Sequence, residues 1–274
     1  MQEILLNGNS FRTFFIELRF NEIVLATGSA FFAELDDIYM LFTNKHNVTG
    51  VDNETGNLLS NTGGKPNNIK ILIPNPSSLN DGGLEVKSSQ YFILKLYQDE
   101  FYEKPNWIEH PNKKVDVVGI NFNPKEINTD KLLFSAKTEW HNWEIGSHIN
   151  VIGYPYGLSS DGFPIWLSGY IASEPNIDFD GLPLFLIDCR TRTGQSGSPV
   201  IAMFKKGDIV EYKGKEYKSK IQQTSLLGIY SGRINSESDL GRVWKTKVLR
   251  EIIEIQRDIN NNMYNKSLER NSLP

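Results

Sequence analysis

Short runs of apolar residues, separated by Gly, Asn, Pro and Asp, recur through most of the chain, and helical periodicity is nearly absent before residue 244. Runs of this length that are rich in β-branched and aromatic residues are typical of β-strands. The first half holds Arg12–Arg19, Val24–Phe32, Ile38–Phe42, Ile69–Ile73, Tyr91–Tyr97 and Val115–Ile120. The second half holds Leu132–Ser135, His148–Tyr154, Pro164–Ala172, Leu184–Asp188, Ser198–Met203 and Thr224–Tyr230. The pattern predicts an all-β protein with two β-barrels, each of about six antiparallel strands.

Three segments interrupt this pattern. Thr49–Asn68 has the Gly and Asn content of a long loop, and 204–223 reads as a hairpin that turns at Lys213-Gly214-Lys215. After residue 244, apolar residues recur every three or four positions through Ile259, which predicts a helix of about four turns packed against a barrel. The expected domains are residues 1–130 and 131–243, followed by a helix over 244–262 and a flexible tail over 263–274.

Composition and charge narrow the classes of function. Hydrophobic residues make up 39% of the 274 positions and charged residues 23%, the profile of a globular protein. The 29 basic and 33 acidic residues give a net charge of −4, so there is no basic surplus for a phosphate backbone or an anionic membrane. No apolar run is long enough to span a bilayer. Neither nucleic acid nor membrane is expected as a partner.

Cysteine usage points to a reducing compartment. Cys189 is the only cysteine, so no intramolecular disulfide can form. The first residues lack the basic segment, the apolar segment and the cleavage site of a secretory signal. We expect a bacterial-type cytoplasmic protein.

The segment Thr193-Gly194-Gln195-Ser196-Gly197-Ser198-Pro199-Val200 carries the strongest chemical signal. Glycines on both sides of a serine permit a tight turn, which can aim the backbone N–H groups of Gly194 and Ser196 at one developing oxyanion. The alternative is a plain Gly/Ser loop between two strands.

A serine nucleophile needs a base, and four histidines are available. His46 stands just past an apolar strand, where its imidazole can project into a cleft. His141 and His148 are read as surface residues, and His110, before Pro111, is read as shaping a strand entry.

The base needs a carboxylate that holds its tautomer. Asp116 lies within the apolar run 115–120, where burial is costly unless a hydrogen bond, such as one from a histidine N–H, compensates. The alternative is an edge-strand aspartate that faces water. Asp37 and Asp99 lie in polar stretches and are expected to be solvated.

The order His46, Asp116, Ser196 resembles that of the chymotrypsin (trypsin-like) serine peptidases. Local motifs agree across roughly residues 12–260, most closely with bacterial, disulfide-free members. They are Gly28-Ser29-Ala30-Phe31-Phe32, Thr43-Asn44-Lys45-His46, His110-Pro111, Val151-Ile152-Gly153-Tyr154-Pro155, Gly194-Gln195-Ser196-Gly197-Ser198-Pro199 and Leu227-Gly228-Ile229-Tyr230. The resemblance implies a chymotrypsin-like double barrel and a serine endopeptidase that acts on protein or peptide substrates, with a His46, Asp116, Ser196 triad and a Gly194/Ser196 oxyanion hole.

Two positions depart from the family pattern. Ser198 replaces a glycine, which is acceptable only where the backbone does not need a positive φ. Gln195 replaces the aspartate that pairs with a freshly cut N-terminus in zymogen-activated relatives. Activation by N-terminal cleavage is therefore not expected, and the oxyanion hole is either intrinsic or organised by a ligand or partner protein.

By counting from the nucleophile, the resemblance puts Arg190 at the base of the primary specificity pocket, with Tyr230, Ser231 and Gly232 as its walls. Arg190 and the nearby Arg192 could favour an acidic substrate side chain through bidentate pairing. The alternative is that one of them pairs with Asp188 or points to solvent.

Rival chemistries are weaker. Cys189 is expected to be a small buried hydrophobe rather than a nucleophile. Asp178 and Asp180 hint at a calcium loop but fit a turn better. We expect no metal and no cofactor, because zinc spacing and a phosphate-binding loop are missing from the sequence. A pseudo-protease or partner-activated effector that uses the fold as a binding module stays open, and an esterase fits less well because the strand–Gly-x-Ser-x-Gly–helix context is missing.

Overall fold

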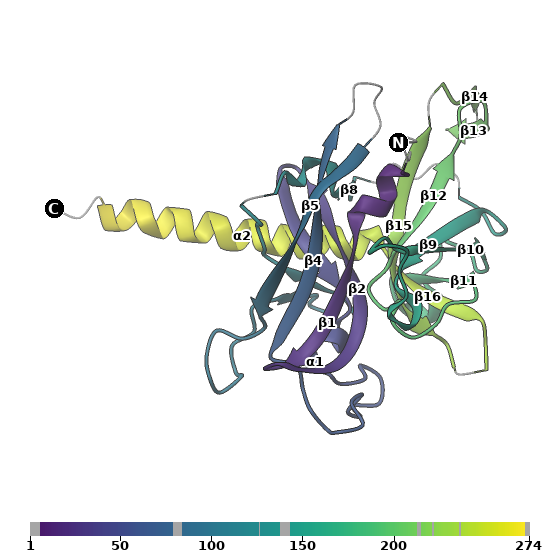
Figure 1. Ribbon diagram of the computed structural model, residues 1–274. Coiled ribbons are helices and arrows are strands. Elements are labelled where there is room, and N and C mark those ends of the chain that lie inside the picture. The colour runs from purple at the N-terminus through teal and green to yellow at the C-terminus, as the bar shows by residue number, and fades with distance from the viewer. Residues whose placement is uncertain are drawn as a thin grey trace.

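Two β units lie side by side, and a long C-terminal helix starts beside one and passes the other (Figure 1). The computed structural model describes residues 6–78, 84–125, 127–137, 143–212, 215–220, 222–235 and 237–271. Short helices occur at η1 (Gly8–Arg12), α1 (Lys45–Thr49), η2 (Thr129–Lys131), η3 (Pro155–Gly157) and η4 (Phe179–Gly181).

The N-terminal unit is one sheet with the strand order β5-β4-β1-β2-β3-β7-β6. Its strands are β1 (Thr13–Phe20), β2 (Ile23–Leu35), β3 (Ile38–Thr43), β4 (Asn68–Ser78), β5 (Leu84–Lys95), β6 (Ile108–Glu109) and β7 (Val118–Ile120). Neighbouring strands on this path are antiparallel. An eighth strand, β8 (Leu133–Ser135), pairs parallel with β2. The pairing of β8 favours a boundary between the units after Ser135, and the division of the chain into two domains stays a prediction.

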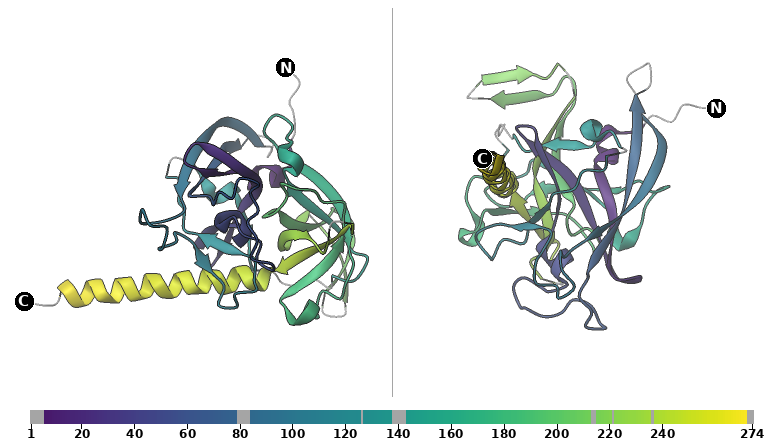
Figure 2. Two further views of the ribbon diagram at one scale, coloured as in Figure 1. Left: turned by 90° about the horizontal axis from the view of Figure 1, so that it is seen from below. Right: turned by 90° about the vertical axis from the view of Figure 1, so that its left-hand side faces the viewer.

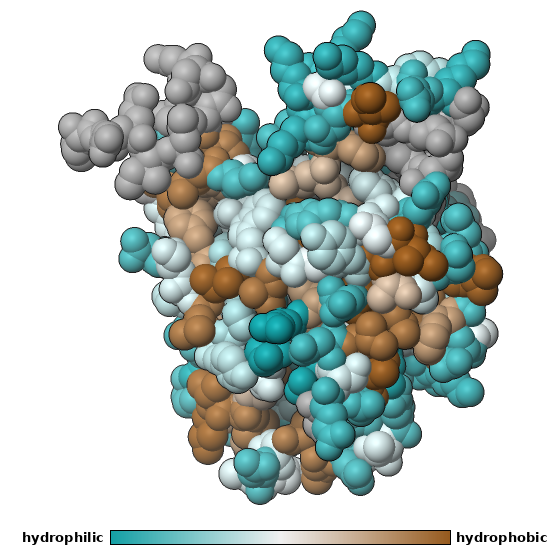
Figure 3. All heavy atoms as spheres, turned by 90° about the vertical axis from the view of Figure 1, so that its right-hand side faces the viewer, coloured by the Kyte–Doolittle hydropathy of each residue, from teal (hydrophilic) through white to brown (hydrophobic). Residues whose placement is uncertain are grey.

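The C-terminal unit is a closed barrel with the strand order β10-β11-β16-β15-β12-β9. Its strands are β9 (His148–Gly153), β10 (Ile165–Ile171), β11 (Leu184–Asp188), β12 (Pro199–Phe204), β15 (Gln223–Arg233) and β16 (Leu240–Lys245). The predicted hairpin is present as β13 (Ile209–Tyr212) paired with β14 (Lys215–Lys218), while Lys213 and Gly214 of its turn lie outside the described residues. Viewed from the barrel side, apolar side chains form separate groups among polar ones, which is ordinary for a globular surface (Figure 3).

The predicted all-β class, with a closed six-stranded barrel and a C-terminal helix, is confirmed. The N-terminal unit differs from the predicted six-stranded barrel in being an eight-stranded sheet. β16, the barrel strand that the pattern missed, contains Gly241 and Arg242 and so lacks a continuous apolar run. Sequence pattern finds strands by their apolar residues, whereas pairing is decided by partners far away in the chain.

The C-terminal helix α2 (Thr246–Asn271) joins the two units and then leaves them. Val248, Leu249, Ile252 and Ile253 are fully buried in a cluster that includes apolar side chains from both β units, as the predicted packing requires. The helix continues past the predicted end at residue 262, and Figure 2 shows it projecting beyond the sheet. In the described part of the chain, no helix combines the length and apolarity needed to cross a bilayer.

Shortening a buried side chain of α2 should destabilise the whole fold. We expect Ile252→Ala to lower the free energy of unfolding by about 2–5 kcal/mol, because it opens a cavity in the cluster shared by both units. Ile259→Ala, at a position on the same helix that is 41% exposed, should change it by less than about 0.5 kcal/mol. Denaturant unfolding of both variants measures the difference, and equal losses would contradict the proposed role of the helix.

Candidate active site

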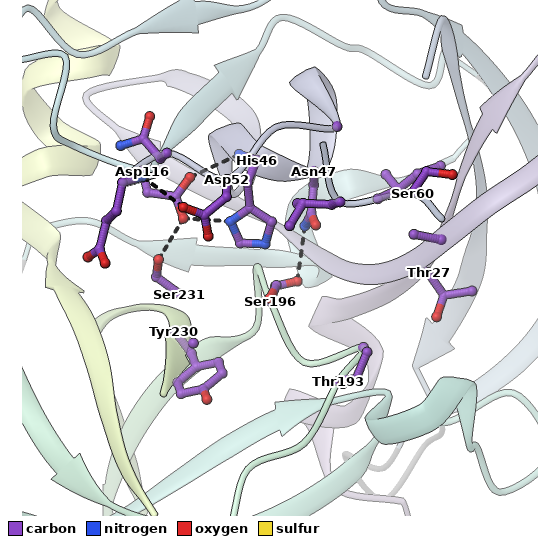
Figure 4. Close-up of a pocket in the computed structure, with 18 of the residues that line it drawn as sticks. Thr27, His46, Asn47, Asp52, Ser60, Asp116, Thr193, Ser196, Tyr230 and Ser231 are labelled. Carbon is purple, nitrogen blue, oxygen red and sulfur yellow. Dashed lines mark hydrogen bonds and ion pairs between the residues drawn. The ribbon is translucent and has the colours of Figure 1, made fainter. Parts of the chain in front are cut away.

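A cavity of about 420 Å³ opens between the two β units, with lining residues from both (Figure 4). The N-terminal unit contributes His46 and Asp116. The loop before β12 contributes Gly194 and Ser196, and β15 contributes Tyr230. The cavity therefore brings together three residues that are far apart in the sequence and that were predicted to act together.

His46 is positioned by the start of α1. β3 ends at Thr43, and Asn44 stands immediately before the short helix, with its side-chain Nδ2 donating to the carbonyl oxygen of Asp116 at 2.7 Å. The backbone N–H of His46 donates to Asp116 Oδ1 at 2.9 Å, and His46 Nδ1 lies 2.6 Å from Asp116 Oδ2. Because a carboxylate only accepts, Nδ1 carries the proton and Nε2 is the free basic nitrogen.

Asp116 is buried, with 6% of its surface exposed, but it does not lie inside a strand as the sequence pattern suggested. It precedes β7, in a segment without regular structure. Its carboxylate accepts from the backbone and ring of His46 and from the hydroxyl of Ser231, 2.6 Å away. These donors compensate the cost of burying the charge and fix the histidine ring.

The pKa of His46 is raised above the ordinary value of 6.5. Burial is the largest single effect and acts to lower it, but the charge of Asp116, its hydrogen bond and the charge of Asp52 together outweigh burial. Asp52 also lines the cavity, and its own pKa is lowered, first by the hydrogen bond from the backbone of Thr55. Sequence reasoning missed Asp52, whose only local signal is a turn in which it caps Glu54 and Thr55.

Ser196 is tied to the N-terminal unit through its backbone. Its carbonyl oxygen accepts from the backbone N–H of Ser29 on β2 at 2.9 Å and from Asn47 Nδ2 at 3.2 Å. Asn47 follows His46 on α1, so this bond couples the serine loop to the element that carries the base. Figure 4 shows His46 and Ser196 facing the same cavity.

Two glycines beside Ser196 have backbone conformations that other residues rarely adopt. Gly194 has φ = 94°, and a Cβ there would clash with the carbonyl oxygen of Tyr154. Gly197 has φ = 88°, and a Cβ there would clash with the carbonyl oxygen of Ser29. Ser198 does not have a positive φ, which meets the condition under which serine can replace glycine there.

The peptide between Thr193 and Gly194 is held in one orientation. The Thr193 carbonyl oxygen accepts from the backbone N–H of Tyr156 at 2.6 Å. Since the peptide is trans, the N–H of Gly194 points away from Tyr156. The side chain of Gln195 fastens the same loop from inside, because its Oε1 accepts from the backbone N–H of Arg192 at 2.9 Å.

The three residues predicted as pocket walls, Tyr230, Ser231 and Gly232, all line the cavity. The side chains of Tyr230 and Ser231 make different contacts. The buried hydroxyl of Tyr230 is hydrogen-bonded to Thr191 Oγ1, and burial raises the pKa of Tyr230 to about 12, so this phenol is neutral. Ser231 was predicted to meet substrate, but its hydroxyl is directed at Asp116.

Arg190 is outside the cavity, contrary to the expectation that it forms the pocket base. Its side chain is 85% exposed, and its Nε lies 3.9 Å from Asp239 Oδ2. Counting back from the nucleophile failed because Arg190 is exposed, whereas the next residue, Thr191, is buried with its hydroxyl hydrogen-bonded to that of Tyr230. Arg192, Arg233 and Arg242 line the cavity instead.

The two other histidines that the structure describes, His110 and His148, do not line this cavity. His110 Nε2 lies 2.7 Å from Glu251 Oε2 on α2, and His148 packs its ring edge-on against Tyr170. His141 lies outside the described residues. Among the histidines that the structure describes, only His46 lines the cavity.

Cys189 and Asp178 behave as the sequence suggested. Cys189 is 2% exposed, and burial raises the pKa of its thiol to about 11, so it is protonated and inert. Asp178 pairs with Lys245 at 2.6 Å beside the turn η4. Across the described residues, no group of three or more His, Cys, Asp or Glu side chains is placed to hold a metal ion.

The raised pKa of His46 can be measured directly. We expect Asp52→Asn to lower this pKa, because it removes a nearby negative charge, and Asp116→Asn to lower it further, because it also removes the hydrogen bond. NMR titration of the imidazole protons gives the values. With a raised folded-state pKa, protonation of His46 stabilises the fold at low pH, and this contribution is lost as pH rises through that pKa.

Asp99→Asn is the matched control for this titration. Asp99 is an exposed carboxylate that caps the backbone of its own loop and does not line the cavity. Its substitution should leave the pKa of His46 unchanged. An unchanged or higher His46 pKa in Asp52→Asn would overturn the electrostatic account.

Comparison with known proteins gives similarities of fold. No protein-family model and no curated protein matches the chain. Among solved structures, the active form of the Rv3671c protease from M. tuberculosis is 16% identical with a TM-score of 0.46, covering 90% of this chain and 81% of that one. Its inactive form is 17% identical with a TM-score of 0.44, covering 90% and 89%. The serine endoprotease from Yersinia pestis is 15% identical with a TM-score of 0.47, covering 92% of this chain and 68% of that one.

Proposed function

We propose that this chain is a serine endopeptidase that hydrolyses peptide bonds with Ser196 as nucleophile, His46 as base and Asp116 as the residue that orients His46. The observation that carries the proposal is the 2.6 Å contact between His46 Nδ1 and Asp116 Oδ2, buried in a cavity that Ser196 also lines. A histidine fixed in this tautomer presents Nε2 as a base in the cavity that Ser196 also lines.

Hydrolysis would proceed in two stages. Ser196 Oγ attacks the scissile carbonyl carbon while His46 Nε2 takes its proton, and His46 then gives that proton to the departing amine as the C–N bond breaks. Water next attacks the acyl-serine, again losing a proton to His46, and the carboxylic acid leaves as Ser196 recovers its proton. Asp116 stays ionised throughout and stabilises the imidazolium.

The negative oxygen of each tetrahedral intermediate would be held by the N–H groups of Gly194 and Ser196. Support comes from the Thr193 carbonyl, which is bound by Tyr156 on the side opposite the Gly194 N–H. An oxyanion donor of this kind typically contributes about 10²–10³ in rate. A donor already oriented in the free protein does not have to be reorganised during the reaction.

The alternative function is a binding module that becomes active only when a partner orders the serine loop. The hydrogen bonds of Gln195 with Arg192 and of Thr193 with Tyr156 favour an enzyme over this alternative, because they hold the loop from within the chain. Gln195 also stands where zymogen-activated relatives have an aspartate that pairs with a freshly cut N-terminus. We therefore propose that the chain is active without proteolytic processing.

A fluorophosphonate probe tests the nucleophile. We expect the purified chain to be labelled at Ser196 and to cleave a denatured protein substrate without a partner. Ser196→Ala should abolish labelling and lower kcat/KM by about 10⁴-fold or more, since the triad acts as a unit. Asp116→Asn should reduce the labelling rate because it releases the histidine tautomer.

Ser198→Ala is the matched control, since it removes a buried hydroxyl two residues away that has no hydrogen-bond partner in the described structure. It should label like the parent chain. Absence of labelling and cleavage in the intact folded chain would overturn the proposal, and labelling that needs an added protein would favour the partner-activated alternative.

A further inference from the structure

The part of the cavity wall formed by the C-terminal unit, which carries Ser196, has only positively charged side chains. Of the lining residues between positions 192 and 244, the ionised side chains are Arg192, Arg233 and Arg242. The acidic lining residues, Asp52, Glu54 and Asp116, all come from the N-terminal unit, which also contributes one basic lining residue, Lys114. The cavity is therefore polarised, with its cationic side next to the proposed nucleophile.

These arginines border the place where a substrate residue would lie. Arg192 is tied to the nucleophile loop through the bond from its N–H to Gln195. Arg233 follows the pocket walls Ser231 and Gly232 on β15, and Arg242 lies on the neighbouring strand, paired in register with Gly232. Both Arg233 and Arg242 are close enough to the buried hydroxyl of Tyr230 to act on it electrostatically.

The three charges are compensated to different degrees. Arg192 pairs with Asp239 at 3.3 Å, and Arg242 reaches across the cavity to Glu54 at 3.2 Å. Arg233 has no ion pair within the described part of the chain. The pair of Glu54 and Arg242 shows that a carboxylate can bind to these arginines. Because the Glu54 side chain is 64% exposed, its ion pair is weak and a substrate carboxylate can displace it.

We propose that the chain cleaves after acidic residues, with the carboxylate of the substrate residue on the acyl side of the scissile bond held by Arg233 and supported by Arg192 and Arg242. The inference rests on the proposed function. Guanidinium groups suit a carboxylate through paired charge-assisted hydrogen bonds, and they oppose a lysine or arginine at the same place. The neutral pair of Thr191 and Tyr230 offers such a cation no counter-charge.

Matched peptides that differ only at this residue test the proposal. We expect kcat/KM for glutamate to exceed that for the isosteric glutamine by about 10- to 100-fold, as one charge-assisted contact warrants. Lysine should be the poorest residue. Arg233→Gln should bring the glutamate-to-glutamine ratio close to one, mainly by lowering kcat/KM for glutamate, and Arg233→Glu should shift the preference towards lysine.

Arg190→Gln is the matched control, because Arg190 carries the same charge nearby but lies outside the cavity. It should keep the ratio of the parent chain. Fluorophosphonate labelling and cleavage of the glutamine peptide report whether each variant is folded and competent. Efficient labelling and cleavage without a preference for glutamate over glutamine would overturn this inference alone, whereas loss of labelling and cleavage in the parent chain would overturn the proposed function with it.

Discussion

The buried carboxylate of Asp116 is the constraint on which the site depends. A charge at 6% exposure must be compensated by hydrogen bonds, and its donors come from two different parts of the molecule. His46 supplies two from α1, and Ser231 supplies one from the barrel strand β15. Satisfying this one carboxylate therefore orients the imidazole and also fixes how the two β units meet at the cavity.

The serine loop depends on a comparable network of backbone bonds. The carbonyls of Thr193 and Ser196 are held by Tyr156 and Ser29, which belong to different units. Gln195 accepts a hydrogen bond from the backbone N–H of Arg192, so an uncharged amide holds the loop in place. This interaction does not require the charge of a newly cut N-terminus. Positive φ angles at Gly194 and Gly197 allow this path, and the space around them excludes a side chain. The loop conformation thus follows from internal contacts.

The polarity of the cavity follows from its construction across two units. Acidic side chains reach it from the N-terminal sheet and its long loop, and arginines reach it from the barrel. The charge of Asp52 acts to raise the pKa of His46, while the charges of Arg233 and Arg242 act on the hydroxyl of Tyr230. Arg242 is paired with Glu54 and Arg192 with Asp239, so among these arginines Arg233 is the one whose charge has no ion-pair partner in the described part of the chain.

The sequence by itself determined most of the strands, the presence of the C-terminal helix and the local chemistry of the serine loop. Apolar runs indicated the barrel strands because burial requires apolar side chains wherever a strand packs, and the glycines around Ser196 marked a turn that only they can make. Both features depend on residues that are neighbours in the sequence, so the sequence alone is enough to predict them.

Only the tertiary structure decided which distant groups meet. The pairing of β8 with β2, the bond from Ser231 to Asp116 and the exposed position of Arg190 each depend on residues far away in the chain. Nothing in the local sequence of Asp52, Arg233 and Arg242 indicates a place in the cavity, since a charged residue in a turn or on a strand is expected to be solvated until the fold closes a cavity around it. Electrostatic interactions depend on the distance between charges, and the distances between residues far apart in the sequence are set only when the chain folds.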